Sequence, residues 1–188
     1  MNCAHWGDTP VPGDGAGAAA DHNPLSGKEL CMRSVYRVLA YLVALEVVIQ
    51  TALIAFAFFG LRKWIADGGV LDAAAIRNHT ATYTGAEGIM VHGINGQMIV
   101  PVIAVLLLIA SFFAKVPGGV LWAAITLVTV VVQVLLGIFG SAVAGLGVLH
   151  GVVAIGLFVI AVVAARRADA ARPAEPETPA SPHAAGIA

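Results

Sequence analysis

The chain has 188 residues, of which 59% are apolar and 11% are charged, and its mean hydropathy is +0.89. Soluble domains are usually about 45–50% apolar and about 25% charged, so this is the composition of an integral membrane protein. The formal net charge is −1 and no basic block occurs, which argues against nucleic acid as a partner. The two cysteines, Cys3 and Cys31, form no C-x-x-C motif, so a cysteine-based metal site is not expected.

Both ends of the chain are predicted to be disordered, cytoplasmic tails. Residues 1–31 are rich in Gly, Ala, Pro and Asp and show no helical or strand period. Residues 168–188 form a second tail of Ala, Pro and Glu. Met32 opens a charged segment that leads directly into an apolar helix, so Met1 and Met32 are both candidate start sites. The transmembrane domain is predicted to span residues 32–167.

Four apolar segments in this domain are long enough to cross a bilayer. They cover about residues 35–59, 88–113, 120–139 and 143–165. The first is longer than the apolar core of a signal peptide, which is usually about 7–15 residues, so we expect a retained helix. Residues 60–87 form the one sizeable loop, and the other connections are short turns. We therefore predict an all-α, integral membrane, four-helix up-and-down bundle.

Lysine and arginine residues near the helix ends predict the orientation. Seven lie on the side of the two termini: Lys28, Arg33, Arg37, Lys115, Arg166, Arg167 and Arg172. The 60–87 loop on the other side carries only Arg62, Lys63 and Arg77. Cytoplasmic segments carry an excess of these residues in multi-pass proteins. We predict a plasma-membrane protein with both termini in the cytoplasm and the 60–87 loop outside.

Two histidines are predicted to lie at the same depth near the outer face. His92 is five residues past Glu87, and His150 is seven residues past Val143. At about 1.5 Å per residue, both imidazoles lie roughly 7–11 Å below the outer boundary. Helices two and four of an up-and-down bundle are diagonal partners across its core. Axial ligation of a haem from both faces requires two histidines at matched depth, so His92 and His150 are candidate ligands of the iron.

The residues around this level fit the same hypothesis. Glycines that would leave room for a flat macrocycle are Gly93, Gly96, Gly137, Gly140, Gly147 and Gly151. The side chains of Gln50, Asn95 and Gln133 are predicted to contact a cofactor edge or to orient a histidine. Glu46, one turn deeper near the middle of the bilayer, is predicted to balance charge or to relay protons.

Helix packing explains these residues without a cofactor. Glycine-rich faces let membrane helices approach closely, and Gln or His side chains form hydrogen bonds across such interfaces. The alternative function is therefore a cofactor-free scaffold or accessory subunit, with other membrane subunits as partners. A second alternative is a small-solute or proton carrier built around Glu46 and Gln50. Catalytic triads, phosphate loops and nucleotide motifs are absent from the sequence, which does not favour an enzyme.

Two segments resemble one four-helix half of the haem A synthase family. The run from Gln133 to Arg167, QVLLGIFGSAVAGLGVLHGVVAIGLFVIAVVAARR, resembles its helix pair, in which a Gln-x-x-x-Gly helix end turns into a helix with a haem-ligand histidine. The run GIMVHGINGQ, residues 88–97, resembles the other histidine-bearing helix. The resemblance implies that His92 and His150 are ligands of haem b.

This chain departs from haem A synthases because it has one half and no cysteine pair in the outer loop. Oxidation of a haem methyl group is therefore not implied, whereas electron transfer with a redox partner, or haem handling, is. The segment from Met32 to Arg167 is also similar to a family of four-helix membrane proteins of unknown function that is common in actinobacteria. The similarity includes the runs VYRVLAYLVALEVVIQ, FGLRKWIADGG and FFAKVPGGV.

Overall fold

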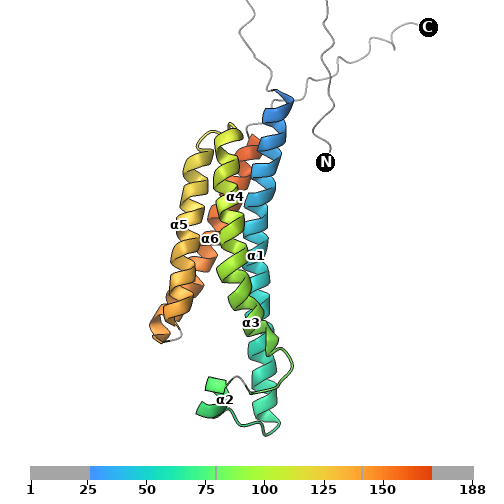
Figure 1. Ribbon diagram of the computed structural model, residues 1–188, viewed down its shortest axis with the longest axis vertical. Coiled ribbons are helices and arrows are strands. Elements are labelled where there is room, and N and C mark those ends of the chain that lie inside the picture. The colour runs from blue at the N-terminus through green and yellow to red at the C-terminus, as the bar shows by residue number, and fades with distance from the viewer. Residues whose placement is uncertain (1–25, 79, 141, 171–188) are drawn as a thin grey trace, which may run out of the picture.

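The computed structural model of the protein describes residues 26–78, 80–140 and 142–170 (Figure 1). These residues form helices and connecting turns, and no strand occurs among them. Most of the two predicted disordered tails, 1–31 and 168–188, lies outside the described ranges. Their described parts are helical, because helices include residues 27–31 and 168–170, and the prediction of disorder is wrong there.

Helix α1 (Gly27–Ala66) begins earlier and ends later than predicted. Ser26 and Glu29 form a capping box at its start: the Ser26 hydroxyl accepts from the Glu29 N–H (3.4 Å), and the Glu29 carboxylate accepts from the Ser26 N–H (3.0 Å). These bonds satisfy donors that a helix N-terminus otherwise leaves free. At the other end, Gly68 adopts a φ of +97°, which terminates the helix. The predicted loop 60–87 is therefore helical as far as Ala66.

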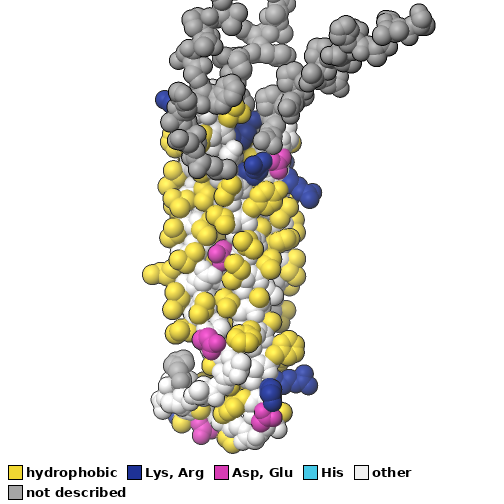
Figure 2. All heavy atoms as spheres, turned by 90° about the vertical axis from the view of Figure 1, so that its right-hand side faces the viewer, with side chains coloured by type: hydrophobic (Ala, Val, Ile, Leu, Met, Phe, Trp, Pro, Cys, Tyr) yellow, Lys and Arg dark blue, Asp and Glu magenta, His cyan; other side chains and the backbone are white. Residues whose placement is uncertain are grey.

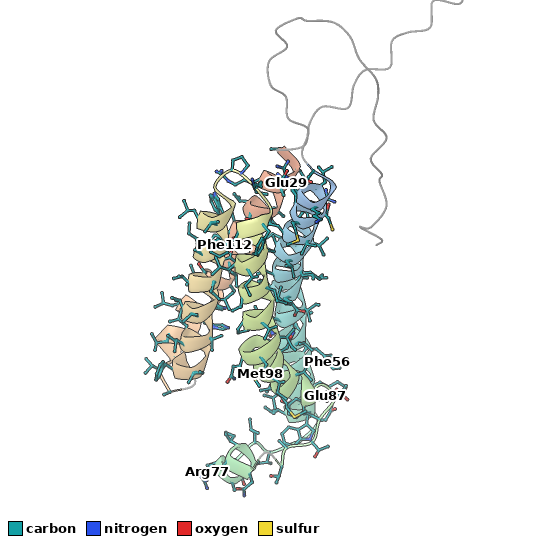
Figure 3. All side chains as sticks on the ribbon, turned by 45° about the horizontal axis from the view of Figure 1, so that its top comes forward. Glu29, Phe56, Arg77, Glu87, Met98 and Phe112 are labelled. Atoms are coloured by element: carbon teal, nitrogen blue, oxygen red, sulfur yellow. The ribbon has the colours of Figure 1, made fainter. Side chains whose placement is uncertain are left out.

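The second membrane segment is one continuous rod of three parts: α3 (Glu87–Ile94), the π-helical turn η1 (Asn95–Ile99) and α4 (Val100–Phe113). Pro101 stands in the first turn of α4, where it lacks an N–H for the helical ladder that continues from η1. The wider turn η1 lies directly before this proline. The short helix α2 (Ala73–Asn78) lies in the preceding loop, and Figure 3 shows Arg77 of α2 away from the helical rods.

The last two long helices are α5 (Gly119–Gly140) and α6 (Ala144–Ala170). The connection between them brings their backbones together, because a Cβ at Gly140 would lie 3.2 Å from the main-chain nitrogen of Gly147. A side chain at position 140 would force these helices apart. Helix α6 also continues past the predicted end at residue 165.

Four rods of this fold are long and apolar enough to cross a membrane: Gly27–Ala66, Glu87–Phe113, Gly119–Gly140 and Ala144–Ala170. On the face shown in Figure 2, hydrophobic side chains cover the middle of the molecule, whereas Lys and Arg side chains gather towards its ends. This distribution matches an apolar bilayer core between two polar interfaces. The fold thus indicates a multi-pass membrane protein.

Small side chains pack the helices tightly at the end where the termini lie. Helix α1 packs against α4 and α6, and α5 packs against the same two helices. The buried core at this end contains Tyr36, Ala40, Leu107, Ala114, Val116, Ala123, Ala164, Ala165 and Ala168. The Tyr36 hydroxyl donates to the Gly119 carbonyl (3.2 Å), and Arg37 pairs with Asp169 (2.7 Å), so α1 is bonded to both α5 and α6.

Helix α3 packs closely against α1 because glycines at and just before the start of α3 face α1. A Cβ at Gly88 would lie 2.6 Å from the Leu53 carbonyl oxygen, and one at Gly85 would lie 2.8 Å from that of Phe56. Helices α5 and α6 diverge from α1 and α3 towards this end of the molecule (Figure 1). The result is a molecule that is tightly packed near its termini and hollowed at the opposite end.

Candidate functional site

A cavity of about 680 Å³ lies between α1, α3, η1, α5 and α6. Small-molecule and cofactor sites usually have volumes of about 300–1,000 Å³ and apolar walls with a few convergent polar groups. Apolar side chains such as Val47, Val130 and Leu157 supply most of this wall. The polar side chains that line it are Gln50, Thr51, His92, Gln97, Gln133 and His150. Its size and its lining are therefore typical of a ligand site.

The two histidines meet in this cavity from different membrane helices. His92 extends from α3 and His150 from α6. Their ring centroids are 6.1 Å apart, and the ring planes are inclined by 66°. Both residues lie within two turns of the ends of their helices that are remote from the termini. Counting residues from those ends predicted the matched depth, and the structure brings the two rings together.

His150 is fixed by a reciprocal pair of hydrogen bonds with Gln133 of α5. Its Nδ1 lies 3.0 Å from the Gln133 carbonyl oxygen, and the Gln133 side-chain amide donates to the His150 carbonyl (3.0 Å). Gly137 lies one turn further along α5 and makes room for the ring: a Cβ there would lie 3.1 Å from His150 Cε1. The Oε1 atom of Gln133 is buried without a hydrogen-bond partner. The pair thus orients the imidazole and leaves one acceptor unused beside it.

His92 is held by Gln50 of α1. Its Nδ1 lies 3.3 Å from the Gln50 carbonyl oxygen. The Gln50 side chain reaches the turn η1, and its amide orientation is assigned from its main-chain partners there. In that orientation Oε1 accepts from the Gly96 N–H (2.9 Å) and Nε2 donates to the His92 carbonyl (3.2 Å). A regular α-helix joins these two main-chain groups to each other, since they are four residues apart. In this rod the Gln50 amide takes the place of that main-chain hydrogen bond, at the point where the α-helix changes into the π-helical turn.

Asn95 and Glu46 lie behind this contact, outside the cavity lining. The Asn95 side-chain nitrogen donates to a Glu46 carboxylate oxygen (2.6 Å) and lies 3.3 Å from the Gln50 Oε1. A chain of polar contacts thus runs from Glu46 through Asn95 and Gln50 to His92. Of the predicted site residues, the structure brings His92, His150, Gln50 and Gln133 to the cavity. It connects Asn95 and Glu46 to them indirectly.

Gln97 also lines the cavity, although the sequence did not single it out as a site residue. Five residues separate it from His92, which corresponds to about 140° around a regular α-helix. The π-turn between them has more residues per turn and reduces that angle. A polar residue five positions after a histidine, directly before a proline-containing turn, is the available sequence signal.

The described residues contain no group of three or more His, Cys, Asp and Glu side chains that could hold a metal ion. Two imidazoles are the metal-ligating side chains that meet in the cavity. Such a pair suits an ion whose other positions are filled by a cofactor, as in haem, better than a structural zinc ion with four protein ligands. Comparisons with protein-family models, with curated proteins and with solved structures found no match.

Proposed function

We propose that this protein is a b-type haem protein of the plasma membrane, built as an up-and-down four-helix bundle, with His92 and His150 as axial ligands. The 6.1 Å separation of the two ring centroids carries the proposal. A metal–imidazole bond is about 2 Å long and each ring adds about 1 Å, so imidazoles on opposite faces of one iron have centroids about 6 Å apart.

The cavity walls also suit a flat, largely apolar macrocycle. Gly147 and Gly151 of α6 line the cavity, and nothing lies within 4 Å of a Cβ built on either residue. Each imidazole contacts its neighbouring helix through Nδ1, so Nε2 is the nitrogen that would bind the iron. At either histidine this requires that the imidazole proton lie on Nδ1. Bound haem would supply a one-electron redox centre, while the chain orients the ligands and excludes water. Electron transfer with a redox partner is the proposed role, because it requires no catalytic side chain beyond the haem and its two ligands.

The proposed orientation places both termini in the cytoplasm and the cavity near the outer face. An excess of Lys and Arg marks the cytoplasmic side of multi-pass proteins, and it supports this orientation. Arg33, Arg37 and Arg167 lie at the end with the termini, against Arg62 and Lys63 in the last turns of α1 at the other end. The resemblance of residues 88–97 and 133–167 to one half of haem A synthase supports the same ligand pair. A redox partner would then approach from the outer side.

One absorption spectrum tests the proposal. After purification in mild detergent and addition of haem b, the protein should show a Soret band of a bound low-spin haem. His92→Ala and His150→Ala should each change or abolish this band. His79→Ala, which alters a histidine between α2 and α3, should leave it unchanged. A protein that binds no haem under these conditions would contradict the proposal and favour a cofactor-free accessory subunit.

A further inference from the structure

Each histidine Nδ1 faces a main-chain carbonyl oxygen, and at His92 a side-chain amide lies closer still. His150 Nδ1 lies 3.0 Å from the carbonyl oxygen of Gln133. A carbonyl oxygen can only accept, so in neutral His150 the proton is on Nδ1. Its Nε2 therefore presents a lone pair. This is the arrangement that metal-binding histidines ordinarily show.

At His92, main-chain groups fix the orientation of the facing amide. The Gly96 N–H can only donate, so the Gln50 atom 2.9 Å from it is the oxygen; the His92 carbonyl can only accept, so the atom 3.2 Å from it is the nitrogen. The same amide nitrogen faces His92 Nδ1. The Gln50 main-chain carbonyl lies farther from Nδ1, at 3.3 Å, than this amide nitrogen does. Because an amide NH₂ donates and cannot accept, Nδ1 is the acceptor in the shorter contact. Neutral His92 therefore carries its proton on Nε2.

We propose that Gln50 and Gln133 hold the two histidines in opposite tautomers, so that the cavity meets a bare Nε2 from His150 and an Nε2–H from His92. All four hydrogen-bonding positions of the Gln50 amide are then used: the amide donates to Nδ1 and the carbonyl of His92, and it accepts from Gly96 and Asn95. Turning this amide over would place donor against donor at Gly96 and acceptor against acceptor at the His92 carbonyl.

For haem, this inference rests on the proposed function and makes the two axial ligands unequal. His150 can ligate as it stands. His92 ligates only after its N–H bond at Nε2 breaks and one forms at Nδ1, with the ring neutral before and after. The Gln50 amide must also turn away, and the Gln50 main-chain carbonyl, 3.3 Å from Nδ1, becomes the acceptor. If haem binds, His92 would therefore be the more readily exchanged ligand.

The tautomers can be read without haem. In haem-free protein labelled with ¹⁵N-histidine, long-range ¹H–¹⁵N spectra in detergent should show an unprotonated Nδ1 for His92 and an unprotonated Nε2 for His150. Assignment uses His92→Ala and His150→Ala. The same tautomer at both positions would overturn the inference. Because this measurement needs no haem, it stands even where the protein fails to bind haem and the proposed function falls.

A matched pair of substitutions tests the part played by Gln50. Gln50→Leu removes the donor at Nδ1 but keeps the main-chain carbonyl, so His92 should change to the Nδ1–H tautomer. Gln133→Leu removes the equivalent side chain but keeps the carbonyl that His150 uses, so His150 should not change. If Gln50→Leu does not fold, Gln50→Met keeps the length of the side chain. If the His92 proton stays on Nε2 in both Gln50→Leu and Gln50→Met, the inference is contradicted.

Haem-loaded protein gives an independent readout. A hydrogen bond is worth about 0.5–1.5 kcal/mol, so freeing His92 from Gln50 should strengthen its ligation by roughly two- to tenfold. Carbon monoxide, which competes with His92, should therefore bind reduced Gln50→Leu protein more weakly than wild type by that factor. Gln133→Leu should not show this loss. Equal affinities of wild type and Gln50→Leu would overturn the unequal-ligand inference while leaving haem binding intact.

Discussion

Gly137 shows how a missing side chain shapes the candidate site. It stands on α5 opposite His150, and a Cβ there would lie 3.1 Å from Cε1 and 3.3 Å from Nδ1 of the imidazole. Few real Cβ contacts are that short, so the ring must move if the position is filled. Gly151 lines the same cavity, but a Cβ there meets nothing within 4 Å. Substitution of Gly137 therefore tests the position of the His150 ring, whereas substitution of Gly151 tests the volume of the cavity.

Gly137→Ala is expected to lower haem affinity by about tenfold or more, the lower end of what changes beside a metal ligand cause. The reason is displacement of His150 from its bonds with Gln133. Haem titration followed by absorbance measures the effect, and circular dichroism checks that the helices are retained. Gly151→Ala is the control and should keep wild-type affinity, whereas Gly151→Phe should fill the cavity and exclude haem. Equal affinities of the two alanine variants would contradict this account.

A second prediction concerns Tyr36, which lies far from the cavity at the end with the termini. Its buried hydroxyl donates to the Gly119 carbonyl and connects α1 to the start of α5. Tyr36→Phe should lower the free energy of unfolding by about 1 kcal/mol, because the hydrogen bond between α1 and α5 is lost. Thermal unfolding in detergent measures this change, with exposed Tyr41→Phe as the control. The haem spectrum should not change; a spectral change in Tyr36→Phe would show that packing at this end controls the site.

The meeting of the two histidines at one level of the molecule could be predicted from the sequence, because a count along two helices needs only the helical rise. The hydrogen bond between Gln50 and Gly96 could not be predicted from the sequence. It depends on the π-turn η1, whose register no apolar period specifies. Gln97 illustrates the same limit, since its place in the cavity follows from the wider turn. The amide orientation that determines the tautomer of His92 is equally a property of the tertiary contact.

Among the elements, all four long helices were predicted, since long apolar segments are a strong signal. The two middle ones were predicted within one residue of their observed bounds, whereas α1 and α6 were predicted too short. Their ends were less predictable. The Ser-x-x-Glu pair at Ser26 is a recognisable capping box, but the Gly- and Pro-rich segment before it favoured a tail. Helix α6 continues to Ala170 because small residues there stay buried: Ala164, Ala165 and Ala168 pack in the core. Composition alone does not show such burial.

Helix α2 is the weakest element of the described structure. It is six residues long, contains no buried residue, and packs little against the long helices. Short exposed segments are the preferred sites of proteolysis. Limited trypsin digestion in detergent should therefore cut first after Arg77, as mass spectrometry of the fragments would show. Arg77→Gln should remove this early cut. First cleavage after Lys63, inside α1, would contradict the contrast between these helices.

On the scale of the whole molecule, the orientation is open to a direct test. We expect a fluorescent protein fused to the C-terminus to fluoresce, because it would fold in the cytoplasm. Alkaline phosphatase inserted after Val70 should be active, because that loop would face outside. The same two reporters exchanged between the sites are the control and should both be silent. The reverse pattern would place the cavity near the cytoplasmic face and contradict the proposed orientation.

The uneven packing of the bundle has an electrical consequence. From His150 to Ala165, α6 rises about 22 Å, about three quarters of the apolar thickness, and the buried residues of α6 along it are apolar: Leu157, Ala161, Ala164 and Ala165. A dry, close-packed layer of this kind carries most of the voltage drop across a membrane. A charge that crosses the full drop gains about 2.3 kcal/mol per 100 mV, and one near the edge gains only a small fraction. A redox centre held by the two histidines, reduced from the nearer side, should therefore shift its midpoint potential by only about a quarter to a third of an applied membrane voltage.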